Sequence, residues 1–415
     1  MADGEPFGFG NRLHYDPSSP IYRRYAANIT TRLAERYSFH PALAMWHINN
    51  EYGPTAYNEA SSVNFRHRLK RRYGDLGTLN EAWTTRFWSQ VYTDWDQIEV
   101  PDIPRAWMNP SRILDFKRFT SDALLECYVA ERDIVRSFRD DIPVMTNFMR
   151  FYRNADYWKW APEEDVAALD IYPDPARPDS HVSAAFQFDL FRSLKGGQPW
   201  MLMEQAASAV SQWKLNVVKE PGRMRLGSLQ AMSRGADSVM FFQWRAGRGG
   251  QERFHSAMLP HSGPGSRAFG EVTALGREVE LLAPVAGTTA RAEVAVLLEG
   301  RAAVIANAYG SGRVVYFATL LEEAAFDAML LGQVEAAGVE NRFGDVPAHV
   351  ECSVRQDAQH EYLFLLNHDA ERGAAVRLPG GGRDLLTGTP ATGEVTLPPL
   401  GAVVIQRALQ ASQAA

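Results

Sequence analysis

The stretch Ala42-Leu-Ala-Met-Trp-His-Ile-Asn-Asn-Glu51 sets a short apolar run directly before a carboxylate. The stretch Trp200-Met-Leu-Met-Glu204 repeats this arrangement. Neither run alternates between apolar and polar residues, which is typical of strands buried on both faces of a parallel sheet. We therefore predict two buried strands, each of which ends close to a glutamate.

The region from about residue 20 to about residue 285 alternates such runs with amphipathic stretches. Strands are predicted at 42–48, 143–149, 167–172, 200–203 and 238–244, and helices at 21–37, 61–73, 113–139, 184–194, 221–234 and 269–282. This alternation predicts an α/β fold with a parallel sheet, for which a (β/α)8 TIM barrel is the leading candidate. Five strands are found where a barrel has eight, so we expect a barrel that lacks its first three strands.

The composition shifts toward alanine, valine and glycine after residue 285. We expect strands at 292–298 and 302–318, the second interrupted by the turn Tyr309-Gly-Ser-Gly312, and a helix at 322–337. Strong alternation from about 346 to 408 predicts an antiparallel β-sandwich. The predicted domains are a partial barrel at 1–285, an α/β segment at 286–340 and an antiparallel β domain at 341–415.

The overall composition excludes several classes of protein. The net charge is −6 and no block of lysine or arginine stands out, which argues against nucleic-acid binding. Cys127 and Cys352 are the only cysteines, which argues against a disulfide framework and a thiolate zinc site. No signal-like segment or apolar stretch of ~18 residues is seen, so a cytoplasmic protein without a membrane partner is expected.

Glu51 and Glu204 are the candidates for chemistry, because catalytic groups of a barrel lie at the carboxyl ends of its strands. Two facing carboxylates ~5–5.5 Å apart can hydrolyse a glycoside with retention. The simpler alternatives are a solvated surface position for Glu51, and for Glu204 a buried ion pair with Arg12 or Arg245. The sequence does not supply the distance that separates these alternatives.

Several longer motifs occur in a fixed order. They are Phe9-Gly-Asn-Arg-Leu-His14, Asn50-Glu-Tyr-Gly53, Leu79-Asn-Glu-Ala-Trp83, Phe87-Trp-Ser-Gln90, Met145-Thr-Asn-Phe-Met149, Leu202-Met-Glu-Gln205 and Phe242-Gln-Trp-Arg245. With these motifs the chain resembles glycoside hydrolase family 42, over most of residues 1–300 and more loosely over 300–405. The resemblance implies a retaining exo-β-galactosidase that hydrolyses terminal non-reducing β-D-galactosides by double displacement. It leaves open a preference for β-fucosides or α-arabinopyranosides.

The resemblance also implies roles for individual residues. Glu51 matches the acid/base and Glu204 the nucleophile. The substrate-binding positions that match are Arg12, Asn50, Trp88, Trp213, Glu252 and His255, of which Trp213 follows a loop that is one residue longer than expected. Tyr172 either orients the nucleophile or only packs at the rim. His40, His47 and His67 are expected to have core or surface roles.

The chain departs from the family in three places. The loop 54–64 has no cysteine, so neither a metal nor another cofactor is implied. The first three barrel strands have no counterpart, and most of the middle domain that makes the family's trimer contacts is missing, so 286–340 is expected to be its remnant. We therefore do not expect the family's trimer, and a monomer or another oligomer stays open. The alternative to an active enzyme is a catalytically impaired family remnant or a sugar-binding protein.

Overall fold

The computed structural model describes residues 14–101, 107–290, 323–339 and 341–409, together with Gly8, Arg12, Ala292 and the strands at 304–309 and 312–317. The chain divides into two compact units, Met1–Ala274 and Leu275–Ala415. Among the helices so described, none is long and apolar enough to cross a membrane.

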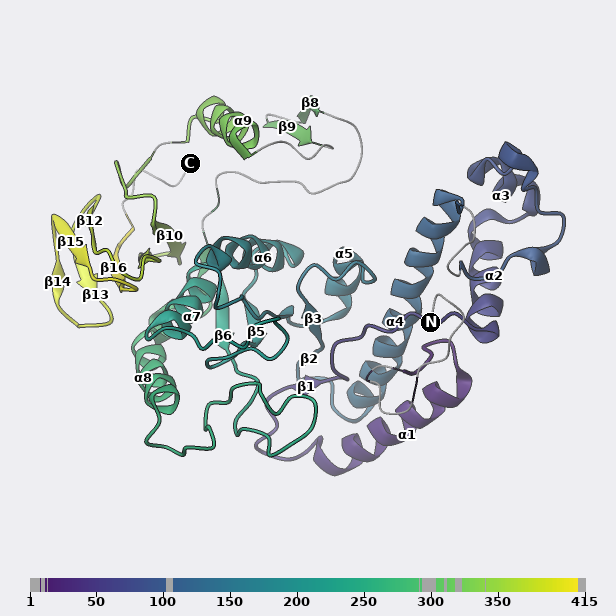
Figure 1. The fold of residues 1–415 in the computed structure, drawn as a ribbon, viewed down its shortest axis with the longest axis horizontal. Coiled ribbons are helices and arrows are strands. Elements are labelled where there is room, and N and C mark those ends of the chain that lie inside the picture. The colour runs from purple at the N-terminus through teal and green to yellow at the C-terminus, as the bar shows by residue number, and fades with distance from the viewer. Residues whose placement is uncertain are drawn as a thin grey trace. The chain divides into compact units, whose positions relative to one another are not determined.

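Parallel strands form the centre of the first unit. They are β1 (Trp46–His47), β2 (Val144–Met145), β3 (Asn147–Met149), β4 (Ala168–Asp170), β5 (Trp200–Glu204) and β6 (Ala236–Val239). β1 pairs with β2, and β3, β4, β5 and β6 pair in chain order (Figure 1). Because Thr146 alone separates β2 from β3, these strands occupy five successive positions. The predicted parallel α/β arrangement is confirmed.

Helices alternate with the strands, and all but α3 and α5 lie where the sequence predicts helices. They are α1 (Pro20–Tyr37), α2 (Glu59–Tyr73), α3 (Leu76–Trp83), α4 (Pro110–Phe138), α5 (Tyr157–Trp160), α6 (Ser180–Leu194), α7 (Arg223–Ser233) and α8 (Arg267–Leu281). The side chain of Ser19 accepts from the Tyr22 N–H ahead of α1, and the side chain of Asn109 caps α4 in the same way. Each of these two helices has a proline in its first turn, where no donor is lost.

The core of the first unit lies between the strands and helices α4 and α6. Trp160 and Trp200 are fully buried there, with Phe188 and Phe191 from α6. A second cluster joins α2 and α3 to α4, where the buried carboxylate of Asp115 accepts from the indole N–H of Trp83 at 2.9 Å. The strands whose ends carry the predicted site are therefore held in place by a well-packed hydrophobic core.

The structure corrects three details of the predicted elements. The first strand covers only Trp46–His47, and α3 was not predicted although its N-cap Asp75 accepts from the Thr78 N–H. The last strand of the unit, β6, begins directly after Gly235 and ends at Val239, not at residue 244. The apolar residues beyond Val239 line a cavity instead, which explains why an apolar run alone misplaced this strand.

The second unit contains antiparallel sheets, as predicted. The larger sheet has the order β14-β13-β16-β11-β10-β7, and β12 pairs with β15. Their bounds are β7 (Thr289–Ala290), β10 (Val350–Gln356), β11 (His360–Asn367), β12 (Ala374–Arg377), β13 (Gly382–Asp384), β14 (Pro390–Ala391), β15 (Glu394–Leu397) and β16 (Ala402–Ala408). Leu363, Leu365, Val376, Leu397 and Ile405 form the buried interior.

Between β7 and β10 in sequence, the second unit also contains the antiparallel pair β8 (Val304–Tyr309) and β9 (Gly312–Phe317), followed by α9 (Glu323–Ala336). The hairpin predicted at 302–318 and the helix predicted at 322–337 are confirmed. Apart from Ala292, the strand predicted at 292–298 lies outside the described residues.

Candidate active site

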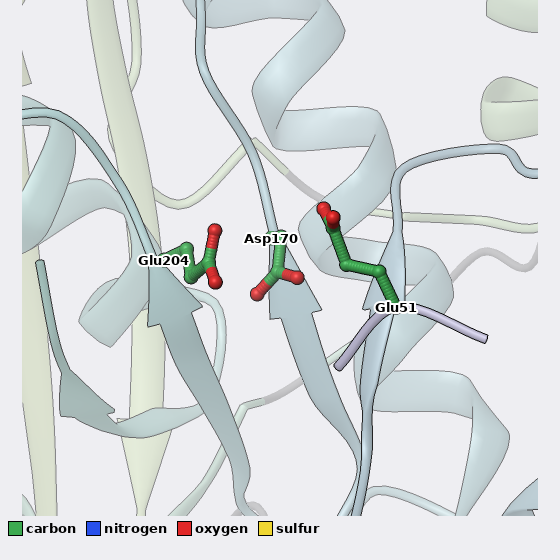
Figure 2. Close-up of side chains that lie close together, drawn as sticks. All are labelled: Glu51, Asp170 and Glu204. Carbon is green, nitrogen blue, oxygen red and sulfur yellow. The ribbon is translucent and has the colours of Figure 1, made fainter. Parts of the chain in front are cut away.

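Three carboxylates meet at the carboxyl ends of the parallel strands. Asp170 is the last residue of β4, Glu204 is the last residue of β5, and Glu51 lies in the turn after β1. One oxygen from each of the three lies within 4.8 Å of the others, as Figure 2 illustrates. Glu51 has a left-handed backbone with φ of 49°, a conformation that non-glycine residues seldom adopt outside functional turns. Residues far apart in sequence are thus gathered into one acidic centre.

Asn147, at the start of β3, holds this centre together. Its Oδ1 accepts from the Glu51 N–H at 2.9 Å and lies 2.9 Å from His47 Nε2. Its Nδ2 donates to Asn50 Oδ1 at 3.0 Å and to Asp170 Oδ2 at 2.5 Å. Because Asn147 is only 1% exposed, these bonds position the Glu51 turn from inside the fold.

Glu51 also faces a cation. Arg12 Nη2 lies 2.5 Å from Glu51 Oε2, and Arg12 Nη1 lies 3.8 Å from Glu252 Oε1. Asn50 Nδ2 donates to the same Glu51 oxygen at 3.3 Å. The Arg12 side chain is 55% exposed, so it can exchange these partners for a ligand's hydroxyl groups at little cost.

Glu204 receives a hydrogen bond from the Tyr172 hydroxyl at 2.5 Å. Burial raises the pKa of Glu204; the Tyr172 hydrogen bond lowers this pKa, and the charge of Glu51 raises it. The indole N–H of Trp213 donates to the Tyr172 carbonyl at 3.1 Å, and its ring lies 5.0 Å from the Arg150 guanidinium carbon. Of the two roles considered for Tyr172, direct contact with Glu204 is the one observed.

His255 lies beside Tyr172 and is only 4% exposed. Its ring meets those of Tyr172 and Phe242 edge-on, with centroids 5.1 and 5.3 Å apart. Its Nδ1 lies 3.5 Å from Ser211 Oγ, whereas Nε2 has no hydrogen-bond partner within the described part of the chain. Burial lowers the pKa of His255, so a neutral ring with a polar nitrogen is available to a ligand.

A cavity of about 890 Å³ opens above the carboxylates. Its lining residues are Arg12, His47, Asn50, Glu51, Tyr172, Met203, Glu204, Gln212, Met240, Phe241, Phe242, Gln243, Gly247, Gly249, Gly250, Gln251, Glu252 and His255. Six of the sequence-derived site residues therefore share one cavity: Arg12, Asn50, Glu51, Glu204, Glu252 and His255. Its size is that of a small-molecule site.

The sequence model of the family described as "Beta-galactosidase", glycoside hydrolase family 42, matches residues 1–282. The chain belongs to this family. The model of the family's "Beta-galactosidase C-terminal domain" matches residues 349–407. Family 42 membership was thus correctly inferred from the motifs.

Curated relatives show the same likeness over part of their length. The β-galactosidase LacZ of Heyndrickxia coagulans is 46% identical over 301 residues, which are 72% of this chain and 45% of that protein. A β-galactosidase of an Arthrobacter species is 45% identical over 303 residues, which are 72% of this chain and 44% of that protein. This chain accordingly spans under half the length of these relatives.

Solved structures of β-galactosidases share the fold. The enzyme from Bacillus circulans sp. alkalophilus is 28% identical and has a TM-score of 0.87. The alignment covers 97% of this chain and 84% of the chain of that structure. The enzyme from Marinomonas ef1 is 34% identical and has a TM-score of 0.62. This alignment covers 67% of this chain and 45% of the chain of that structure. The first unit of this family 42 chain is consequently of the TIM-barrel class and the second is an antiparallel β unit.

Two of the residues inferred from family 42 motifs do not line the cavity. Trp213 donates to the Tyr172 carbonyl and packs beside the cavity against Tyr172 and Val210. Trp88 is 59% exposed in the 3₁₀ turn Phe87–Ser89 and stacks on Trp107, with ring centroids 6.1 Å apart. The turn that carries Trp88 follows directly after α3. Because α3 packs against α4, the Trp88 ring lies beside these helices and not at the ends of the strands.

Three residues of the centre escaped the sequence analysis. Asn147 and Asp170 were not proposed, and His47, assigned to a core or surface role, lines the cavity. Asp170 carried a usable signal, because it is a carboxylate inside the apolar run predicted as the strand 167–172, where an unpaired charge would be costly. Asn147 belongs to the motif Met145-Thr-Asn-Phe-Met149, but its amide was given no role, because its partners are known only from the tertiary structure.

Proposed function

We propose that the chain is a retaining exo-β-galactosidase that hydrolyses terminal non-reducing β-D-galactosides. The observation that carries this proposal is the placement of the Glu51 and Glu204 carboxylates at one cavity, with an oxygen of each within 4.8 Å. Inverting enzymes hold their two carboxyl groups ~6.5–9.5 Å apart to admit a water, and retaining enzymes hold them ~5–5.5 Å apart. Oxygens this close fit the retaining arrangement, and the family resemblance implies double displacement in the same way.

In the first step, ionised Glu204 attacks the anomeric carbon and the bond to the leaving oxygen breaks. Glu51 transfers its proton to that oxygen. In the second step, Glu51 removes a proton from water, whose oxygen attacks the anomeric carbon and releases Glu204. The product keeps the β configuration, and both glutamates return to their first protonation states.

The other cavity residues fit the recognition of a sugar. Arg12 and Asn50 present donors beside Glu51, Glu252 presents a carboxylate 3.8 Å from Arg12, and His255 presents a ring nitrogen beside Tyr172. A small galactoside held between them would place its anomeric carbon near Glu204. We propose a small-molecule substrate and no metal, because a glycosyl–glutamate intermediate needs only the two carboxylates.

Hydrolysis of nitrophenyl β-D-galactoside by the purified chain tests the proposal, with product configuration followed by NMR. We expect turnover with the β anomer released first. Parallel assays with β-fucoside and α-arabinopyranoside substrates establish which sugar gives the highest kcat/KM. Binding of galactose without turnover would favour the sugar-binding remnant instead.

The Tyr172→Phe variant should lower kcat/KM by about 10- to 100-fold, because the Tyr172 hydroxyl stabilises the ionised form of Glu204. Loss of that hydrogen bond raises the pKa of Glu204, so the acidic limb of the pH profile should move to higher pH. The matched control is Tyr362→Phe, at a buried tyrosine of the second unit. An unmoved acidic limb in Tyr172→Phe would contradict the assigned contact.

We further propose that the five strand positions correspond to the fourth to eighth of a (β/α)8 barrel, and that 286–340 is a remnant of a middle domain. Two features of α1 and β1 support the first point. Among the described strands β1 pairs only with β2, which leaves its other edge unpaired. Large apolar residues at intervals of four form an exposed stripe on α1, namely Ile21, Tyr25, Ile29, Leu33 and Tyr37.

The α1 stripe is expected to contact the remaining βα units of a complete barrel. Co-expression with a segment carrying three such units from a family 42 relative should raise galactosidase activity at least ~10-fold. Joint substitution of Ile29→Lys and Leu33→Lys should prevent this gain, whereas Glu35→Gln, off the stripe, should not. Equal activity with and without the segment would argue against completion.

A further inference from the structure

Asp170 is a third carboxylate that the double-displacement mechanism does not use. It is 2% exposed at the end of β4, and the strand register places it opposite Glu204 of β5. Figure 2 shows its carboxyl group between those of Glu51 and Glu204. Any charge on Asp170 therefore acts on both of them.

The two oxygens of Asp170 have different surroundings. Oδ2 accepts from Asn147 Nδ2 at 2.5 Å. Oδ1 is equally buried, but it has no hydrogen-bond partner among the residues that the structure describes. A proton on the carboxyl group therefore belongs on Oδ1, since Oδ2 must stay an acceptor for Asn147.

Charge balance at the centre favours a neutral Asp170. Like charges this close disfavour simultaneous ionisation, and the group with the least solvent loses its charge first. The charged groups that act on Asp170 are Glu204, Glu51 and Arg12, and Arg12 is exposed and already paired with Glu51. Burial raises the pKa of Asp170 well above its ordinary value, Glu204 and Glu51 raise it further, and Asn147 and Arg12 lower it.

We propose that Asp170 is a positioning residue that keeps its proton in the working site, so that Glu204 can ionise. This inference rests on the proposed galactosidase function. As a neutral acid, Asp170 adds no negative charge beside the nucleophile. Through Oδ2 it also holds Asn147, which in turn binds the Glu51 N–H and Asn50.

The Asp170→Asn variant tests the charge. Asparagine has the same shape, is always neutral, and can still accept from Asn147. We expect both limbs of the pH profile to stay within about 0.3 pH unit of those of the parent. If Asp170 is ionised in the parent, its replacement removes a negative charge beside both glutamates and lowers the limbs by about one pH unit or more. Such a shift would overturn the proposal.

The Asp170→Ala variant tests the positioning. Asn147 then loses one of the two acceptors of its Nδ2, and we expect kcat/KM to fall about 100-fold because the amide orients the Glu51 turn less well. Full activity in Asp170→Ala would overturn the positioning role. Thermal unfolding of both variants shows whether they fold, and if Asp170→Ala does not, Asp170→Asn still decides the question of charge.

Infrared difference spectroscopy of the parent chain against Asp170→Asn supplies a readout that does not depend on activity. In the difference spectrum at neutral pH we expect the carboxylic-acid C=O band of one group, present in the parent and lost in the variant, because the band of protonated Glu51 is common to both and cancels. A difference spectrum with only carboxylate bands would overturn the proposal. If the parent chain bears the acid band but does not cleave galactosides, the proposed function fails and the protonation of Asp170 stands.

Discussion

The Glu204→Gln variant is expected to lower kcat/KM for nitrophenyl β-D-galactoside by at least about 10⁴-fold. Glutamine has nearly the same shape and can still accept the hydrogen bond from Tyr172. Its neutral amide cannot attack the anomeric carbon, so the covalent intermediate does not form. The loss should therefore appear mainly in kcat. The variant should be measured in the form that gives the highest turnover, either the chain alone or the chain co-expressed with the three βα units.

Glu280→Gln is the matched control for this variant. Glu280 is exposed on α8 and lies outside the cavity, so its substitution should leave kcat/KM within about twofold. Both variants should unfold within about 2 °C of the parent chain. Retention of more than a tenth of the parent activity in Glu204→Gln would rule out Glu204 as the nucleophile.

The second large effect is expected in Glu51→Gln, and its size should depend on the leaving group. A poor leaving group needs the proton from Glu51, so kcat/KM for an alkyl β-galactoside should fall by about 10²- to 10⁴-fold. Dinitrophenolate leaves without protonation, so kcat/KM for dinitrophenyl β-galactoside should fall less than tenfold. Comparison of the two substrates on the same enzyme gives the measurement.

Added azide distinguishes the two glutamates. In Glu51→Gln the glycosyl–Glu204 intermediate still forms, and azide can attack it without a general base. We expect azide to restore turnover of the dinitrophenyl substrate and to yield β-galactosyl azide. Equal losses with both leaving groups and no effect of azide would show that Glu51 is not the acid/base.

Local patterns were sufficient to predict most of the secondary structure. The apolar runs located five parallel strand positions, and the helices begin or end at residues with clear signals, such as Pro20 and Gly74. These signals are local because capping, turn formation and strand burial depend on a few neighbouring residues. The strand predicted at 238–244 was wrong beyond Val239, because a local apolar pattern does not distinguish residues that line a cavity from residues of a buried strand.

The sequence by itself determined the family, the strand ends that carry Glu51 and Glu204, and the order of the cavity motifs. Only the tertiary structure decided which other groups join them. Asp170 reaches the centre because the β4–β5 register sets it opposite Glu204, and Asn147 because one amide spans the ends of β1 and β4. Trp88 is absent from the cavity because its turn follows α3 and packs with Trp107. Strand register and helix packing are long-range properties, so no short stretch of sequence encodes which side chains converge.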